Sequence, residues 1–177
     1  MKLDIKYETI KPILGVLFVL YIMLLITVVF FKEGYTVSMM LLKQTNRPLI
    51  GNFIPFKTIT FYCRTSSIDI TIRELIGNVI AFAPMGFLLP LCFNRIKGIE
   101  KVFIISFTIS LFFEIIQIIT NLGIFDVDDI MLNTLGAIIG FMIYKAIIKM
   151  IPVYGKTKNK KQKTKRYHCM MLMEKLL

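Results

Sequence analysis

Four long apolar runs, separated by shorter polar segments, dominate the pattern of this chain. They cover residues 12–31, 75–93, 102–122 and 130–151. Each is about 20 residues long, the length that an α-helix needs to cross the hydrocarbon core of a bilayer. The first run exceeds the roughly 7–15-residue core of a secretory signal, so we expect it to be a retained span. The pattern predicts an all-α, polytopic membrane helix bundle with about four transmembrane helices.

The segment between the first two runs, residues 32–74, has no comparable pattern. Its apolar patch is interrupted by Lys43, Arg47 and Lys57, which leave no uncharged stretch of about 20 residues. We therefore expect a first external loop that contains an interfacial or re-entrant piece. A fifth membrane-embedded segment is the alternative.

Composition agrees with a membrane protein, because 56% of the residues are hydrophobic and the mean hydropathy is +0.71. A soluble domain usually has about 45–50% apolar residues. The net charge of +11 is concentrated toward the C-terminus, in residues 152–177. A basic run beside a hydrophobic helix is typical of a cytoplasmic segment that faces anionic lipid headgroups, and it does not indicate nucleic acid. The chain thus divides into a transmembrane domain, residues 1–151, and a basic cytoplasmic tail, residues 152–177.

The distribution of lysine and arginine predicts the orientation of the spans. Basic residues gather before the first run, in the turn 94–101 and after Lys145, and four spans would place these three regions on one side. By the positive-inside rule that side is the cytoplasm, so both termini should be cytoplasmic. The turn "GIFDVDD" has no basic residue and should face outward, together with the long loop, which the rule constrains less.

Cysteine and histidine usage limits the chemistry. Cys63, Cys92 and Cys169 show neither metal-ligand spacing nor a disulfide framework, and the predicted topology separates them, so we expect free thiols. His168 is the one histidine and lies in the basic tail. A histidine-rich metal site or a Ser-His-Asp triad is therefore not expected.

Polar side chains gather in the outward half of the predicted bundle. Glu114 would lie about 12 Å below the outer end of its span at 1.5 Å per residue, a depth at which an ionisable group usually marks an interior pair or a functional site. Asn133 follows Asp129 by four positions and shares its helix face. The candidate ligand-binding residues are Arg73, Asn78, Glu114, Gln117, Asp126, Asp128, Asp129 and Asn133. They predict an outward-facing polar pocket above apolar helix packing.

Simpler structural roles compete with this interpretation. Asp128 or Asp129 would suit the N-cap of the last helix, and Glu114 would suit a packing pair with Arg73. Gly136 and Gly140 form a GxxxG pattern, which favours close helix approach. A pocket of mixed charge can neutralise itself, bind a charged headgroup or hold a divalent cation. The candidate metal ligands are Asp126, Asp128 and Asp129, and no other cofactor is indicated.

Four motifs follow one another across about residues 50–145, in a transmembrane setting: "GNFIPF", "RELIGNVIAFAPMGFLLP", "FFEIIQ" and "FDVDDIMLNTLGAIIG". In their order and spacing they resemble the VanZ-like family of small bacterial integral membrane proteins. The resemblance implies a protein of the bacterial cell membrane. The family's namesake is associated with low-level resistance to teicoplanin, a lipoglycopeptide that binds peptidoglycan precursors.

Two hypotheses for the function follow. The first is a non-enzymatic protein that contributes to glycopeptide resistance or tolerance by binding an envelope lipid, a precursor or the antibiotic in the polar pocket. The alternative is a membrane enzyme that modifies a lipid-linked envelope substrate, with Glu114 as the candidate catalytic acid or base and the aspartates holding a cation.

Overall fold

The computed structural model describes residues 2–30, 51–120 and 122–150. Residues 32–50 of the predicted external loop, where a fifth segment would begin, lie outside the described residues. The predicted basic tail, 152–177, lies outside them as well, so its contact with anionic lipid stays a prediction.

The described residues form helices joined by short connections, and no strand occurs among them. The elements are α1 (Lys2–Phe30), α3 (Lys57–Thr65), α4 (Ile68–Thr71), the π-helical turn η1 (Ile72–Ile76), α5 (Gly77–Cys92), α6 (Ile99–Thr120) and α7 (Val127–Met150). Long helices follow from the apolar runs, because a helix satisfies its own backbone hydrogen bonds where water is absent.

Four helical stretches are long and apolar enough to cross a membrane: Lys11–Phe30, Ile68–Cys92, Ile99–Thr120 and Val127–Met150. The prediction of a four-span helical bundle is thereby confirmed for the described part of the chain. The second span begins seven residues before the predicted boundary of 75, because α4, η1 and α5 run on continuously. Within the π-turn, Glu74 lies inward and Arg73 outward.

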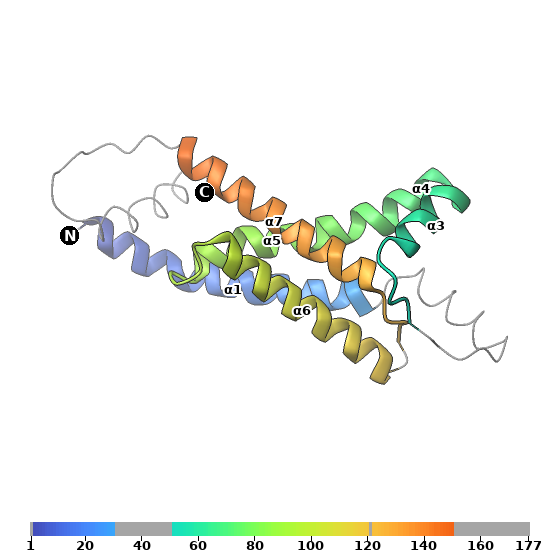
Figure 1. The fold of residues 1–177 in the computed structure, drawn as a ribbon. Helices are drawn as coiled ribbons and strands as arrows, with labels where there is room; N and C mark the ends of the chain where they lie inside the picture. Colours follow the sequence, from blue (N-terminus) through green and yellow to red (C-terminus); the bar gives the residue numbers. More distant parts are fainter. Residues whose placement is uncertain (1, 31–50, 121, 151–177) are drawn as a thin grey trace.

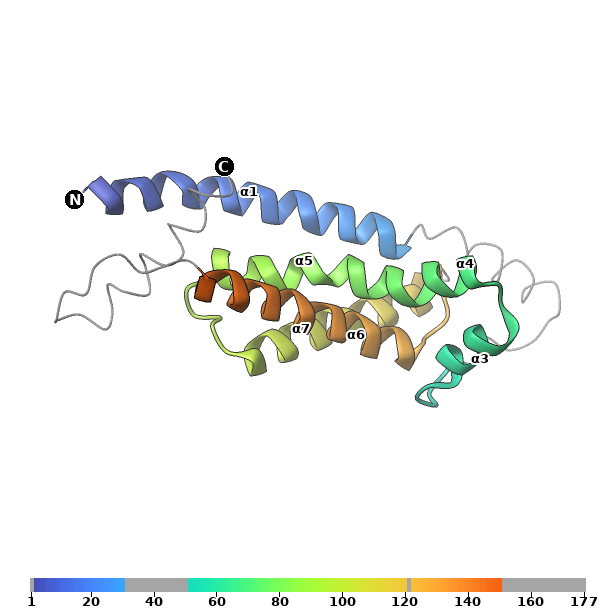
Figure 2. The same cartoon turned by 90° about the horizontal axis from the view of Figure 1, so that it is seen from above.

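The long helices run roughly along the long axis of the molecule, and α5 and α7 cross at the centre of the bundle (Figure 1). Seen from above, α1 follows one side of α5, while α6 and α7 lie on the other (Figure 2). The core between them is apolar and includes Phe82, Met85, Val102 and Ala137, none of which is exposed to solvent. The start of α1, the α5–α6 turn and the end of α7 share one end of the molecule.

Helices α5 and α7 approach until their backbones touch at three glycines. A methyl group on Gly140 would lie 1.8 Å from the carbonyl oxygen of Ala83, and one on Gly136 would lie 2.2 Å from that of Val79. Gly86 of α5 faces α7 in the same way, at Ala137. The GxxxG pattern is therefore a packing signal, as the spacing predicts.

Helix α1 is joined to α5 by apolar packing and one hydrogen bond. Leu14 and Leu25 are buried, and the Tyr21 hydroxyl donates to the Ala81 carbonyl oxygen at 2.8 Å. Ala81 lies in the turn where Pro84, which has no N–H, leaves the neighbouring Ile80 carbonyl oxygen without its usual helical donor. A polar side chain from a neighbouring helix is a usual partner for such a turn.

The cysteines agree with the prediction as far as they are described. Cys63 is an exposed thiol in α3, and Cys92 at the end of α5 is half-buried and donates to the Leu14 carbonyl oxygen at 3.6 Å. Neither forms a disulfide. Cys169 lies outside the described residues.

Candidate functional site

The acidic turn between α6 and α7 begins with the cap of α7. Asp126 precedes the first residue of α7, and its Oδ1 accepts the backbone N–H of Asp128 at 2.9 Å. This is the N-cap arrangement, in which a side-chain oxygen satisfies one of the free N–H groups of the first turn. One aspartate therefore caps the helix, as expected, but it is Asp126 and not Asp128 or Asp129.

Glu114 supports this cap from the neighbouring helix. It is buried in α6, with 2% of its surface exposed, and its Oε2 accepts the backbone N–H of Asp126 at 2.8 Å. The carboxylate thus meets a donor at the point where the chain turns into α7. This bond joins Glu114 to the turn, and its pairing with Arg73 stays a prediction.

Residues 51–58 lie against the acidic turn and complete its hydrogen bonding. Asn52 forms an isolated parallel bridge with Asp126: its N–H donates to the Phe125 oxygen at 2.7 Å, and its oxygen accepts the Val127 N–H at 3.0 Å. The Asn52 amide also donates to Asp126 Oδ1 at 2.9 Å, and the Thr58 hydroxyl donates to Asp126 Oδ2 at 2.5 Å.

Asp128 binds the start of α3. Its carboxylate accepts the backbone N–H groups of Phe56 at 2.5 Å, Thr58 at 2.8 Å and Ile59 at 3.2 Å. The last two belong to the first turn of α3, where N–H groups lack helical partners and favour a negative charge. Phe56 reaches this position with a φ of 65°, in the left-handed region. Asp128 is fully buried and holds α3 onto α7.

A second group of polar side chains lies beside this clamp. The Asn78 amide of α5 donates to Asp129 Oδ1 at 2.6 Å, and Asp129 is half-buried. Tyr62 of α3 is half-buried, and it lies close enough to these carboxylates for their charges to act on its hydroxyl. Burial, and after it the negative charges of Glu74, Asp129 and Asp126, raise the pKa of Tyr62 to about 12. Tyr62 therefore keeps its proton at neutral pH.

The remaining predicted residues lie deeper in the bundle. The Asn133 amide donates to the Ser110 hydroxyl of α6 at 2.9 Å, and the Gln117 amide donates to the Val29 carbonyl oxygen of α1 at 3.0 Å. Two buried oxygens, Gln117 Oε1 and Thr134 Oγ1, have no hydrogen-bond partner among the described residues. These amides join helices to one another within the bundle.

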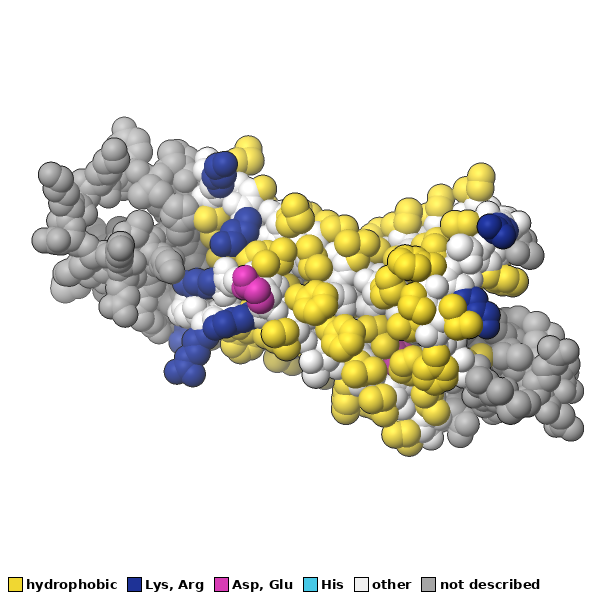
Figure 3. Space-filling model, in the orientation of Figure 1, with side chains coloured by type: hydrophobic (Ala, Val, Ile, Leu, Met, Phe, Trp, Pro, Cys, Tyr) yellow, Lys and Arg dark blue, Asp and Glu magenta, His cyan; other side chains and the backbone are white. Residues whose placement is uncertain are grey.

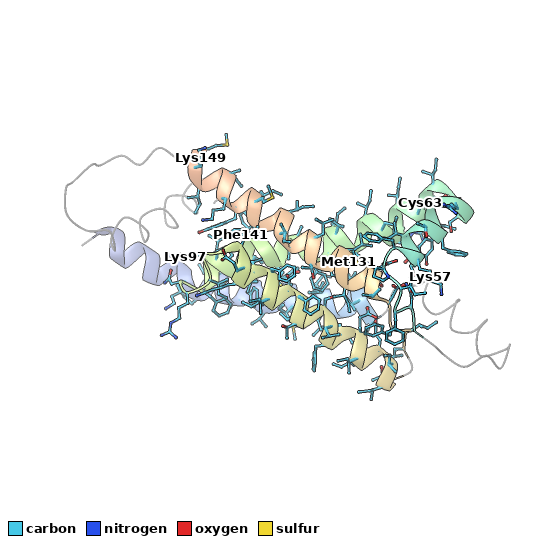
Figure 4. All side chains as sticks on the ribbon, in the orientation of Figure 1. Lys57, Cys63, Lys97, Met131, Phe141 and Lys149 are labelled. Atoms are coloured by element: carbon cyan, nitrogen blue, oxygen red, sulfur yellow. The ribbon has the colours of Figure 1, made fainter. Side chains whose placement is uncertain are left out.

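Arg73 is the predicted site residue that the structure sets apart. Its side chain is exposed on η1, while its neighbour Glu74 turns inward and is 9% exposed. The end of the molecule that carries the acidic turn accordingly shows Lys and Arg on its surface and little of its carboxylates (Figure 3). Lys57 and Cys63 of α3 mark this end, and Lys97 and Lys149 mark the opposite one (Figure 4).

The predicted metal ligands do not converge as a set. In residues 2–30, 51–120 and 122–150, no group of three or more His, Cys, Asp and Glu side chains is arranged to hold a metal ion. Asp128 is directed at backbone N–H groups and Asp126 at Asn52 and Thr58. Cation binding by Asp126, Asp128 and Asp129 stays a prediction.

Sequence reasoning missed several members of this acidic cluster, which we define as Glu74, Glu114, Asp126, Asp128 and Asp129 with their polar partners. The missed residues are Asn52, Thr58, Tyr62 and Glu74. Asn52 stands in the motif "GNFIPF", which was available as a signal. Thr58 and Tyr62 lie on a short helix whose position depends on Asp128, about 70 residues away in sequence, and no local pattern indicates that contact.

Comparison with known proteins decides the family. A family model described as VanZ/LLP1 matches residues 18–149, a range that contains the whole acidic cluster. The chain belongs to the VanZ family. Protein VanZ of Enterococcus faecium is 35% identical over 128 residues, which are 72% of this chain and 71% of that protein. No solved structure matches the chain. The VanZ family and four apolar spans make this a multi-pass membrane protein.

Proposed function

We propose that this VanZ-family protein contributes to tolerance of teicoplanin-type glycopeptides at the bacterial cell envelope, as a binding protein. Its ligand is an envelope lipid, a peptidoglycan precursor or the antibiotic, which meets the protein at the acidic cluster on the outward side. The proposal rests on the likeness to protein VanZ and on the namesake's association with teicoplanin resistance.

One structural observation supports the acidic cluster as the binding region. Carboxylates inside a membrane protein are costly and tend to mark functional positions, and here five buried or half-buried ones come from η1, α6 and the turn into α7. Asp126, Asp128 and Glu114 stabilise the backbone of the turn. Asp129 is the half-buried member, beside Asn78 and Tyr62. We therefore assign the ligand contact to Asp129, with Asn78 and Tyr62 beside it.

The test compares conservative variants in a host that the wild-type protein protects against teicoplanin. Asp129→Asn removes a charge at the ligand contact and should lower the minimal inhibitory concentration to near the empty-vector value. Asp69→Asn removes an exposed charge from α4 at the same end of the molecule and should leave tolerance unchanged. Immunoblots of membrane fractions would show equal amounts of both variants. Full tolerance with Asp129→Asn would rule out this role.

An enzymatic role on a lipid-linked substrate is the second candidate, and one observation favours it. A protonated phenol, Tyr62, lies within the electrostatic influence of the Glu74 and Asp129 carboxylates, and a phenol and a carboxylate can serve as acid and base in catalysis. Purified protein would be incubated with labelled lipid-linked precursors, with and without Mg²⁺. Product that depends on Asp129 would favour the enzyme, and unchanged precursor in both conditions would favour the binding protein.

A further inference from the structure

Helix α3 presents a basic and aromatic face away from the bundle. Lys57, Thr60, Phe61 and Arg64 are all exposed and follow one another at the i, i+3, i+4 and i+7 positions of one helix side. The opposite side carries Tyr62, which lies close to the carboxylates of the acidic cluster. The side of α3 toward the protein therefore carries Thr58, Ile59 and Tyr62, and its outer face combines an aromatic ring with two cations.

The helix that follows α3 is exposed along an isoleucine ridge. Ile68, Ile72, Ile76 and Ile80 recur at every fourth position, and their exposed fractions are 80%, 50%, 47% and 64%. This ridge continues without interruption from α4 through η1 into α5. In a membrane-spanning helix, such a continuous apolar ridge faces lipid.

The length of this span is compatible with a position of α3 at the membrane surface. The helical stretch Ile68–Cys92 has 25 residues and is therefore about 37 Å long at 1.5 Å per residue. The hydrocarbon core is only about 30 Å thick. The excess leaves room for the first turns of this stretch, and for α3 before them, in the headgroup layer. The exposed Lys57, Phe61 and Arg64 of α3 favour that position, because aromatic and basic side chains are enriched there.

The charge at this level is complementary to phosphate. Lys57, Arg64 and Arg73 are exposed, and Asp69 is the exposed acid of the same segment. The carboxylates of the acidic cluster are buried or half-buried behind α3. The surface of Figure 3 shows the result, with Lys and Arg beside hydrophobic side chains at this end of the molecule.

We propose that the outer face of α3, formed by Lys57, Phe61 and Arg64, docks onto the phosphate headgroups of anionic phospholipids. Phe61 enters the interface between headgroups and acyl chains, while the two cations bind phosphate on either side of it. This site is separate from the acidic cluster and does not depend on the function proposed above. Because Asp128 binds the first turn of α3, docking also holds the acidic cluster at the lipid surface.

The experiment uses the absence of tryptophan from the natural sequence. Phe61→Trp introduces one fluorophore at the centre of the proposed face of the full-length protein. The variant is reconstituted in bilayers of phosphatidylcholine and phosphatidylglycerol, with bromine on the acyl chains of one or the other lipid. Quenching by each brominated lipid reports how often that lipid contacts the introduced indole ring relative to its share of the bilayer.

We expect brominated phosphatidylglycerol to be favoured about fivefold, the effect of roughly one cation at an anionic surface. When Lys57→Gln and Arg64→Gln are added to Phe61→Trp, the ratio of quenching by the two brominated lipids should fall to about one, so that neither lipid is preferred. Arg95→Gln with Lys101→Gln, at the opposite end, is the matched control and should leave it unchanged. Equal quenching by both lipids would overturn the proposal. Quenching by aqueous acrylamide alone would also overturn the proposal, because it would place the indole ring in water. An emission that depends on the protein-to-lipid ratio would overturn it too, because it would indicate a second copy of the chain on this face.

Discussion

The three aspartates of the acidic turn differ in role although they fall within four consecutive positions. Asp126 caps α7, Asp128 binds the N-terminus of α3, and Asp129 pairs with Asn78 of α5. The difference comes from direction: successive residues at a helix start point about 100° apart, so each side chain meets a different element. The presence of three aspartates in this turn therefore does not by itself identify a metal site.

Replacement of Asp128 should destabilise the protein more than replacement of an exposed aspartate. Asp128→Asn keeps the side-chain size but removes the charge and one of the oxygens that accept three backbone N–H groups. We expect a loss of roughly 2–3 kcal/mol in the free energy of unfolding, measured by thermal or chemical unfolding in detergent. Asp69→Asn, which changes an exposed aspartate, should stay within about 0.5 kcal/mol of wild type. Equal stability of the two variants would contradict the clamp.

Tyr62 should make stability depend on alkaline pH. Its pKa is raised to about 12 in the folded protein, first by burial and then by neighbouring carboxylates, from an ordinary value of 10.0. Between these values the unfolded protein loses the phenolic proton while the folded protein keeps it, so stability should fall as pH rises from about 10 to about 12. Tyr62→Phe should remove this part of the fall. The difference between wild type and variant, followed by phenolate absorbance and unfolding midpoint, tests the assignment, and a constant difference across this pH range would refute it.

At the scale of elements, the α5–α7 pair organises the bundle. Lipid tails are as apolar as leucine, so burial of apolar surface contributes little to helix association in a bilayer, and close packing matters more. The glycines of both helices permit backbone contact at Val79, Ala83 and Ala137. This contact brings Asn78 of α5 level with Asp129 of α7. Helix packing thus positions the acidic cluster.

A methyl group at this crossing should separate the two helices. Gly140→Ala would place a carbon 1.8 Å from the Ala83 oxygen, and we expect a loss of about 1–3 kcal/mol in stability from overpacking. Gly77→Ala is the matched control, because nothing lies within 4 Å of its added carbon and alanine favours a helix by up to about 1 kcal/mol. Unfolding midpoints in detergent would rank Gly77→Ala at or above wild type and Gly140→Ala below it. The reverse order would show that the crossing is looser than described.

At the scale of the whole molecule, the two ends differ in chemistry. One end carries the acidic cluster with α3 over it, and the other carries Lys97 and Lys149 (Figure 4). With four spans, the start of α1 and the end of α7 lie at this second end (Figure 1). The positive-inside rule predicts that it faces the cytoplasm.

Labelling of single cysteines in intact cells would test that orientation. Cys63, kept as the one cysteine by Cys92→Ser and Cys169→Ser, is exposed on α3 and should react with a membrane-impermeant maleimide. A cysteine placed at Lys97 in a cysteine-free background should react only after the membrane is made permeable. Labelling of the Lys97 position alone in intact cells would reverse the predicted topology and place the acidic cluster in the cytoplasm.

The sequence by itself determined the membrane class, the four spans and the close approach at Gly136 and Gly140. These features follow from local quantities: the length of an apolar run, the helical repeat and the lack of a side chain at glycine. The burial of Glu114 was also predictable, because its place within an apolar run is a local feature of the chain.

The tertiary structure alone decided which polar groups meet. Asp128 binds α3 across about 70 residues, Glu74 turns inward while Arg73 turns outward, and Tyr62 lies close to carboxylates of other elements. Hydrogen-bond partners depend on how each helix is rotated about its axis and how deep it lies in the membrane. The apolar pattern leaves both undetermined, because an apolar helix can face lipid in many orientations. Two contacts select one arrangement of the helices. One is the close packing at the glycines, and the other is the bond from Asp128 to the first N–H groups of α3, which have no partner within that helix.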